Sequence, residues 1–280
     1  MQPFTFFHGA RLCTFVDTTV KKTKIPYRDP FGYPIWVKRI VIFLFGIIVW
    51  YRCNYINKLK IKGGFNLKKL PSKNVLFVSN HQTYFMDAAA LILVFCHVKN
   101  KIHDRSDKFW PLALPKLNVF FIAAKETMKS GILPRLLALA GSVSIKRTWR
   151  EAGINVKRNA DQKDIKNIKS AIRLGWVITF PQGSTKPFIK GRRGTAHLIK
   201  ELNPTVVPVV INGFRRAFDK KGLRTKKRGT ELNIEFKKPL VFSPEDNNQQ
   251  IMDKIMDEIE QAPNYKAFRK FNVPNKITQE

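Results

Sequence analysis

The chain has 280 residues, of which 44% are hydrophobic, and it carries a formal net charge of +31. This length fits one large domain or a domain with an appendage, and this hydrophobic content excludes wholesale disorder. So basic a protein is expected to bind anions, and composition alone leaves nucleic acid, anionic lipid headgroups and an acidic carrier protein as candidates. The three cysteines lie far apart without a C-x-x-C pair, which predicts neither a disulfide framework nor a zinc site.

The first part of the chain contains the segment most suited to a membrane surface. Residues 1–34 show no clear periodicity and no secretory leader, so we expect an N-terminal extension. The most apolar run follows at residues 40–50, with Lys38–Arg39 before it and Trp50–Tyr51 at its end. As a helix this run spans roughly 17 Å, whereas a bilayer core is about 30 Å thick. The flanking cations and aromatic residues favour a helix half-embedded in the membrane interface, with a buried core helix as the alternative.

From about Lys73 onward, strand-like and helix-like patterns alternate. Apolar runs bounded by turn residues predict strands at 74–78, 119–123, 142–145, 176–180, 206–211 and 232–236. Three helices are predicted in the same region. The first contains Ile165, Ile168 and Ile172 on one face and ends at Gly175, and the second covers residues 193–202. The third begins with a capping box at 243–246 and continues through Ile251, Ile255 and Ile259. Pro208 predicts an edge or bulged position for its strand.

This alternation predicts an α/β fold, with a mixed, largely parallel sheet flanked by helices and an N-terminal membrane-associated helical segment. We expect three parts: residues 1–58 as the extension and interfacial helix, 59–242 as the main domain, and 243–280 as a C-terminal helix and tail. Active sites of such sheets gather at the carboxyl ends of the strands. His81 follows the first predicted strand and Gln182 follows the fourth, which predicts that both lie at one edge.

His81 and Asp87 bracket the link between the first predicted strand and an apolar run at 88–96. Imidazole accepts a proton near neutral pH, and a carboxylate can hold its ring in one tautomer. The pair is therefore a candidate for general-base catalysis, with a structural histidine as the alternative reading. Cys96 lies within the apolar run and is predicted to be a core residue.

Four sequence blocks occur in order along the chain. They are S-N-H-Q-T-Y-F-M-D at 79–87, G-S-V-S-I-K-R at 141–147, G-W-V-I-T-F-P-Q-G-S at 175–184 and V-V-P-V-V-I at 206–211. Together with F-I-A-A-K-E at 121–126, they resemble the 1-acylglycerol-3-phosphate acyltransferases and related glycerolipid acyltransferases, over roughly residues 61–240. The resemblance implies transfer of an acyl chain from acyl-CoA or acyl-carrier protein to a lysolipid hydroxyl, without a cofactor. No metal site is expected, because the histidines other than His81 show no ligand spacing.

The resemblance also implies roles for individual residues. His81 would be the general base, with Asp87 as its partner. The sequence does not identify the oxyanion donor, and backbone N–H groups near Gly183 are our own hypothesis for it. The residues implied in substrate binding come from the second and third blocks: Lys146, Arg147, Gln182, Gly183, Ser184 and Lys186.

Two departures from the family pattern affect these expectations. Five residues, rather than four, separate His81 from Asp87, so we expect His81 on the incoming loop or the first turn of the helix, with a wider turn absorbing the extra residue. The third block reads F-P-Q-G-S-T instead of F-P-E-G-T-R, which leaves Thr185 at the arginine position associated with the acceptor's phosphate. A guanidinium binds phosphate through two hydrogen bonds, whereas threonine offers one hydroxyl. Lysophosphatidate remains the leading acceptor, with Lys186 and Arg147 as substitute cations, and a phosphate-free lyso-aminolipid is the alternative.

The expected partners follow from charge and resemblance together. We expect a lysolipid, a thioester donor and an anionic membrane surface as partners, with the protein on the cytoplasmic face of the membrane. No recognisable nucleic-acid module is present, so we expect no nucleic-acid partner. The basic run at 220–229 is predicted to be a solvated loop, with a membrane- or carrier-facing patch as the alternative. The competing function is a catalytically inactive scaffold that binds membrane or nucleic acid.

Overall fold

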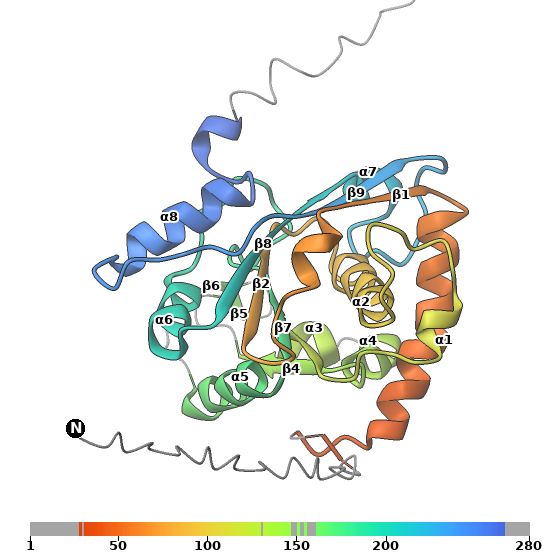
Figure 1. Ribbon diagram of the computed structural model, residues 1–280, viewed down its shortest axis with the longest axis horizontal. Helices are drawn as coiled ribbons and strands as arrows, with labels where there is room; N and C mark the ends of the chain where they lie inside the picture. The colour runs from red at the N-terminus through yellow and green to blue at the C-terminus, as the bar shows by residue number, and fades with distance from the viewer. Residues whose placement is uncertain are drawn as a thin grey trace, which may run out of the picture.

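The protein is a layered α/β structure with one central sheet between two groups of helices (Figure 1). The computed structural model describes residues 28–29, 31–129, 131–146, 150–151, 154–155 and 161–266, with 150–151 and 154–155 as backbone alone. The seven strands of the main sheet are β1 (Lys58–Lys62), β2 (Val75–Ser79), β3 (Val119–Ala124), β4 (Ser142–Ile145), β7 (Trp176–Thr179), β8 (Thr205–Asn212) and β9 (Glu231–Phe236). A separate small hairpin pairs β5 (Arg150–Glu151) with β6 (Ile154–Asn155).

The strand order β1-β9-β8-β2-β7-β3-β4 puts the three strands that precede the candidate site side by side. β8, β2, β7, β3 and β4 are mutually parallel, whereas β9 runs antiparallel to β8 and β1 runs parallel to β9. The predicted mixed, largely parallel sheet is thus confirmed. Because β7, β2 and β8 are parallel neighbours, the segments that follow them emerge at one edge of the sheet.

Residues of β2 alternate between the two faces, as strand geometry requires. Val75 and Phe77 pack with α1 (Ile35–Asn54), α2 (Met86–Lys99), α3 (Lys125–Lys129) and α4 (Ile132–Ala138) on one face. Leu76 and Val78 pack on the other face with α5 (Gln162–Leu174), α6 (Arg193–Leu202) and α8 (Asn248–Glu258), which lie to the left of the sheet in Figure 1. Two short 3-10 turns, η1 (Gly64–Leu67) and η2 (Trp110–Leu112), and the one-turn α7 (Phe214–Ala217) complete the described elements.

One local prediction is wrong and another is wrong in part. The N-cap of the last helix lies four residues later than the predicted Ser243. Residues 243–246 form an isolated turn, in which Asp246 accepts from the Ser243 N–H at 2.8 Å and donates its own N–H to the Ser243 carbonyl at 3.1 Å. Asn247 is the N-cap instead, and it forms a capping box with Gln250. Pro208 lies in β8, an internal strand, so the edge alternative is wrong. The β8–β9 ladder ends next to it with Val209 paired to Phe236, and pairing resumes at Val206 with Leu240, three residues along β8 but four along the partner segment. Pro208 therefore lies where the ladder is irregular, in line with the bulged alternative.

The predicted apolar helix at residues 40–50 lies within α1. Within the described part of the chain, no helix combines the length and apolarity needed to cross a membrane. Val41, Ile42 and Val49 of α1 belong to the same buried cluster as the sheet, so this face of α1 is part of the core.

Lys38 of α1 points inward rather than toward a surface. Its ammonium donates to the Val119 carbonyl at 2.8 Å and lies 4.3 Å from the centre of the Phe120 ring, and the side chain is only 1% exposed. Burial lowers the pKa of Lys38 to about 8, partly offset by the charge of Asp29. Lys38 therefore fastens α1 to β3 as a buried cation.

This lowered pKa predicts a stability that depends on pH. Between pH 8 and 10.5 the unfolded chain binds a proton on Lys38 that the folded protein has released, so stability should rise with pH. The gain over this window should approach about 3 kcal/mol, at 1.36 kcal/mol per pKa unit. Urea unfolding of wild type and Lys38→Met across this range measures it, with exposed Lys166→Met as control. An equal slope in wild type and Lys38→Met would contradict the assignment.

Candidate active site

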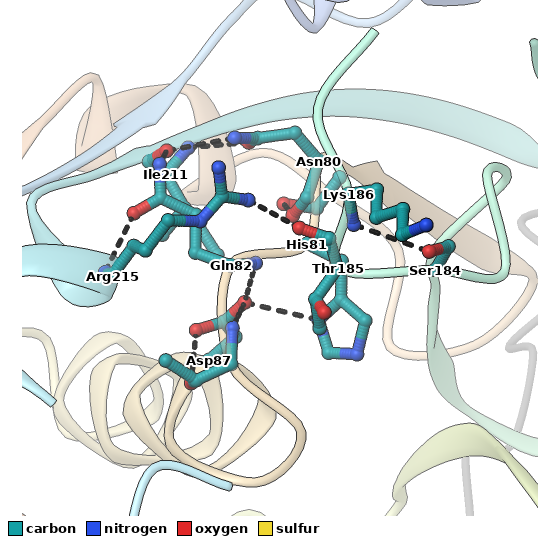
Figure 2. A network of polar contacts seen from close by, with 11 residues as sticks. Asn80, His81, Gln82, Asp87, Ser184, Thr185, Lys186, Ile211 and Arg215 are labelled. Atoms are coloured by element: carbon teal, nitrogen blue, oxygen red, sulfur yellow. Dashed lines mark hydrogen bonds and ion pairs between the residues drawn. The ribbon is translucent and has the colours of Figure 1, made fainter. Parts of the chain in front are cut away.

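His81 lies in the loop that joins β2 to α2, two residues past the end of the strand. Its Nδ1 lies 3.0 Å from Oδ2 of Asp87, which is in the first turn of α2 (Figure 2). The histidine side chain is 13% exposed, whereas the aspartate is fully buried. The predicted His–Asp pair is therefore formed, and the loop accommodates the extra residue between them.

Asp87 is an acceptor for four hydrogen bonds. Oδ2 accepts from the backbone N–H groups of Gln82 (2.5 Å) and Thr83 (3.0 Å) as well as from His81, and Oδ1 accepts from Thr83 Oγ1 at 2.6 Å. The loop thus wraps around the carboxylate at the N-terminal end of α2, where helix N–H groups and the dipole favour an anion. This arrangement fixes the position of the carboxylate that orients His81.

The tautomer of His81 follows from this contact. A carboxylate only accepts, so Nδ1 must carry the proton, and Nε2 is left with its lone pair. Figure 2 shows Nε2 on the side of the ring turned away from Asp87. The ring stacks on Phe180, with centroids 3.9 Å apart and planes tilted by 18°. The imidazole is therefore fixed on one face by Phe180 and at one edge by Asp87.

Asn80 and Gln82 join the His81 loop, residues 80–85 between β2 and α2, to the end of β8. Asn80 bonds Ile211 through both amide atoms, donating to its carbonyl at 2.8 Å and accepting from its N–H at 2.7 Å. Gln82 Nε2 donates to the same carbonyl at 2.9 Å, and its Oε1 accepts from the Arg215 N–H at 3.1 Å. Backbone pairing between β2 and β8 ends at Ser79. Beyond it, the Asn80 and Gln82 side chains bond to the backbone at the end of β8, which fixes the position of the loop relative to the sheet.

The basic run at 220–229 also supports the His81 loop, through hydrogen bonds between backbone groups. The carbonyls of Lys220 and Lys221 accept from the N–H groups of Tyr84 and Phe85, at 3.0 and 3.1 Å. Gly222 has φ +81°, and a Cβ placed there would lie 2.8 Å from Met86 atoms. This segment is therefore more than a solvated loop, because its backbone holds the segment between His81 and Asp87.

The third block forms a turn next to His81, since β7 is the neighbour of β2. Gly183 has φ +60°, and its N–H donates to the Phe180 carbonyl at 2.9 Å. The Gly183 N–H is thus engaged within the turn, which argues against this one of the N–H groups near Gly183 as an oxyanion donor. Ser184 Oγ accepts from the Lys186 N–H at 3.1 Å, and the Lys186 side chain is exposed (Figure 2).

Gln182 follows β7 as predicted, but its side chain is 1% exposed. Its Nε2 donates to the Ile189 carbonyl at 3.0 Å and to Gln261 Oε1 at 3.3 Å. Both partners are acceptors, so this position needs an N–H donor, which glutamine has and a carboxylate lacks. The contact with Gln261 accounts for glutamine where the family pattern has glutamate.

Gln182→Glu is therefore expected to destabilise the protein without raising its activity. A carboxylate would face two acceptor oxygens, and leaving a buried charged group unpaired costs about 2 kcal/mol or more. Urea unfolding measures the loss, and exposed Gln162→Glu at the start of α5 is the matched control. A variant that is as stable as wild type and more active would show instead that residue 182 acts on substrate.

The second block lies farther from His81. Lys146 follows β4, three strands away from β2 and therefore roughly 14 Å along the sheet, and its side chain is exposed. Its N–H donates to Asp164 Oδ2 at 2.7 Å, and Lys125 donates to Oδ1 of the same carboxylate at 2.7 Å. The structure thus does not bring Lys146 next to His81, and Arg147 lies outside the described residues.

Sequence reasoning missed several residues that surround His81. Phe180, Asn80 and Gln82 were within the quoted blocks, but only the folded structure shows their contacts. Phe180 stacks on the His81 ring, and Asn80 and Gln82 bond to Ile211. Arg215 follows the fourth block, and its Nη2 donates to the Thr185 carbonyl. The rule that sites gather at carboxyl ends of parallel strands would have pointed to Arg215 as well as to His81.

The described thiols do not compete with His81 as reacting groups. Cys53 and Cys96 are free and fully buried, and burial raises their pKa values to about 12 and about 11. Cys96 is therefore a core residue, as predicted. Among the described residues, no three His, Cys, Asp or Glu side chains group closely enough to hold a metal ion.

A family model described as "Acyltransferase" matches residues 60–212, which is more than half of the chain. The chain belongs to the acyltransferase family. This confirms the resemblance to glycerolipid acyltransferases, and the matched range ends at β8, so it includes all four blocks.

The acyltransferase is also similar in structure to the 1-acyl-sn-glycerophosphate (LPA) acyltransferase PlsC from Thermotoga maritima, with a TM-score of 0.51. The two are 16% identical, and the match covers 82% of this chain and 79% of that one, which shows a shared fold. No curated protein sequence matches this chain.

Proposed function

We propose that this acyltransferase moves a fatty acyl chain from acyl-CoA or acyl-carrier protein to the hydroxyl of a lysolipid, with 1-acylglycerol-3-phosphate as the leading acceptor. One observation carries the proposal: an imidazole held by a buried carboxylate, with its second nitrogen turned away from that carboxylate, at the carboxyl edge of the sheet. An inactive scaffold has no need of this pair. The intact pair therefore favours the enzyme over the competing function of a binding protein.

The His81–Asp87 pair supports direct transfer of the acyl group from the thioester to the acceptor hydroxyl, without an acyl-enzyme intermediate. His81 Nε2 accepts the proton of the acceptor hydroxyl while its oxygen attacks the thioester carbonyl. Collapse of the tetrahedral intermediate breaks the carbon–sulfur bond, and the thiolate takes the proton back from the imidazolium. Asp87 stabilises the imidazolium during this interval. The products are an ester and a free thiol, with the enzyme unchanged and no cofactor required.

A small apolar cavity near the His81 loop suits the acyl chain. It has a volume of about 50 Å³, and Tyr84 and Phe85, which lie between His81 and Asp87, form part of its wall. Val41, Phe45 and Gly46 of α1 line the opposite side. This volume holds only a few water-sized groups, so a long chain would have to separate α1 from α2. Side chains on the cavity wall contribute mainly apolar surface, which suits hydrocarbon.

The outer face of α1 supports the proposed membrane surface. Its side chains at every fourth position are about half exposed, namely Trp36, Ile40, Leu44 and Ile48. Contiguous exposed apolar residues mark an interaction site, and a basic protein is attracted to anionic lipid. We therefore propose that α1 lies in the membrane interface, on the cytoplasmic face, where a lysolipid acceptor is available.

A product screen tests the proposed function. Purified protein in mixed micelles is given oleoyl-CoA or oleoyl-acyl-carrier protein, with 1-oleoylglycerol-3-phosphate or a phosphate-free lyso-aminolipid as acceptor. Mass spectrometry should detect the diacyl product of the phosphate-bearing acceptor. Product from the aminolipid alone would replace the leading acceptor with the alternative, and no product from any pair would contradict the proposed function.

A further inference from the structure

Arg215 links the third-block turn to the residue that follows His81. It lies in the first turn of α7, directly after β8, and its Nη2 donates to the Thr185 carbonyl. Its own N–H donates to Gln82 Oε1 at 3.1 Å. Figure 2 shows the guanidinium reaching from the end of β8 toward the turn that contains Thr185. Arg215 is thus in contact with both segments that border the catalytic imidazole.

This turn lacks a guanidinium of its own. Thr185 stands where the family pattern has arginine, and its side chain is buried, with 8% exposed. Because β8 and β7 lie on either side of β2, a side chain from the end of β8 can reach the turn after β7. Arg215 therefore places a guanidinium at this turn, where the residue at the arginine position of the family pattern is Thr185.

The surroundings of Arg215 are cationic. Lys226 donates to the Arg215 carbonyl at 3.2 Å, and Lys186 is exposed on the turn itself. The carboxylates of these segments are engaged elsewhere. Asp87 is enclosed by its four donors, and Asp219 accepts from the N–H groups of Leu223 and Arg224. Among the described residues of 79–87, 180–192 and 212–230, the two carboxylates thus have donors of their own, and an anion that enters here meets Lys186 and Lys226 beside Arg215.

We infer that Arg215 binds the phosphate of the acceptor lipid and so determines specificity for a phosphate-bearing lysolipid. A guanidinium carries five N–H donors in a fixed plane, so it can hold the Thr185 carbonyl and a phosphate oxygen together. The acceptor's phosphate is attached to the carbon next to the one that bears the reacting hydroxyl. A cation tied to Gln82 and Thr185 is therefore suitably placed to orient that hydroxyl toward His81. The inference rests on the proposed function and assigns its phosphate site.

Binding of glycerol 3-phosphate to the purified protein tests the site without requiring turnover. Titration calorimetry of wild type should show binding that glycerol does not reproduce. Arg215→Gln should weaken it about 10- to 100-fold, since a charge-assisted hydrogen bond contributes about 1.5–3 kcal/mol. Arg215→Lys should recover part of the loss, because lysine keeps the charge without the planar fork. Exposed Arg216→Gln, on the same turn of α7, is the matched control and should bind as wild type does.

Kinetics then separate specificity from a structural role. Arg215→Gln should raise KM for 1-oleoylglycerol-3-phosphate by a similar factor and leave KM for 1-oleoylglycerol unchanged. Equal losses on both acceptors, or glycerol 3-phosphate binding equal to wild type, would overturn the inference. If no lysolipid is acylated but glycerol 3-phosphate still binds in an Arg215-dependent way, the proposed function fails and the phosphate site stands.

Discussion

His81→Ala is expected to lower kcat by about 10²–10⁴-fold while leaving the fold intact, because proton transfer by a positioned base contributes a factor of this size. The imidazole makes a single polar contact among the described residues, with Asp87, so its removal leaves the sheet and helices unaffected. Product formation is measured with saturating donor and acceptor, and far-UV circular dichroism reports the fold.

The matched control is His197→Ala, which removes a histidine with a 69% exposed side chain on α6. This variant should retain wild-type activity. If His81→Ala folds and turns over at the wild-type rate, another group must remove the proton, and the proposed mechanism is wrong. Both variants keep the net charge of the protein nearly constant, so altered membrane attraction does not confuse the comparison.

Asp87→Asn should be almost as inactive as His81→Ala, for a different reason. An amide nitrogen at this position would oppose donors from Gln82 and Thr83, and an amide cannot stabilise the imidazolium as a carboxylate does. We expect kcat to fall on the order of 10²–10⁴-fold. We also expect a loss of about 1–3 kcal/mol in the free energy of unfolding, because buried partners lose their acceptor.

The two effects can be separated from general damage to the protein. Asp257→Asn, at an exposed position on α8, should change neither activity nor stability. The double variant His81→Ala/Asp87→Asn should be hardly less active than His81→Ala alone, since the two side chains act as a unit. Fully multiplicative losses in the double variant would show that Asp87 acts independently of His81.

The strands β2, β7 and β8 were predicted well because they are buried on both faces. They are runs of apolar, mostly β-branched residues bounded by turn residues, and their observed ends differ from the predicted ones by at most one residue. β1 was not predicted, because its lysines alternate with apolar residues and it is mostly exposed.

The N-cap of the last helix was harder to predict than the strands, because several nearby polar residues can accept a hydrogen bond from the first N–H groups of a helix. Ser243 and Asn247 both begin sequences typical of a capping box. Asn247 is the N-cap because its side chain accepts from the N–H groups of Gln249 and Gln250, at 2.9 and 3.0 Å.

The residues themselves determined the His–Asp pair, the carboxyl edge on which it lies and the family to which the chain belongs, since these depend on order along the chain. The tertiary structure alone decided how the pair is used and what surrounds it. Gln182 is turned inward by Gln261, which is 79 residues away, and Arg215 reaches the third-block turn from another strand. Such contacts join segments that no local pattern connects, because they arise only when packing of the sheet and helices brings distant side chains together.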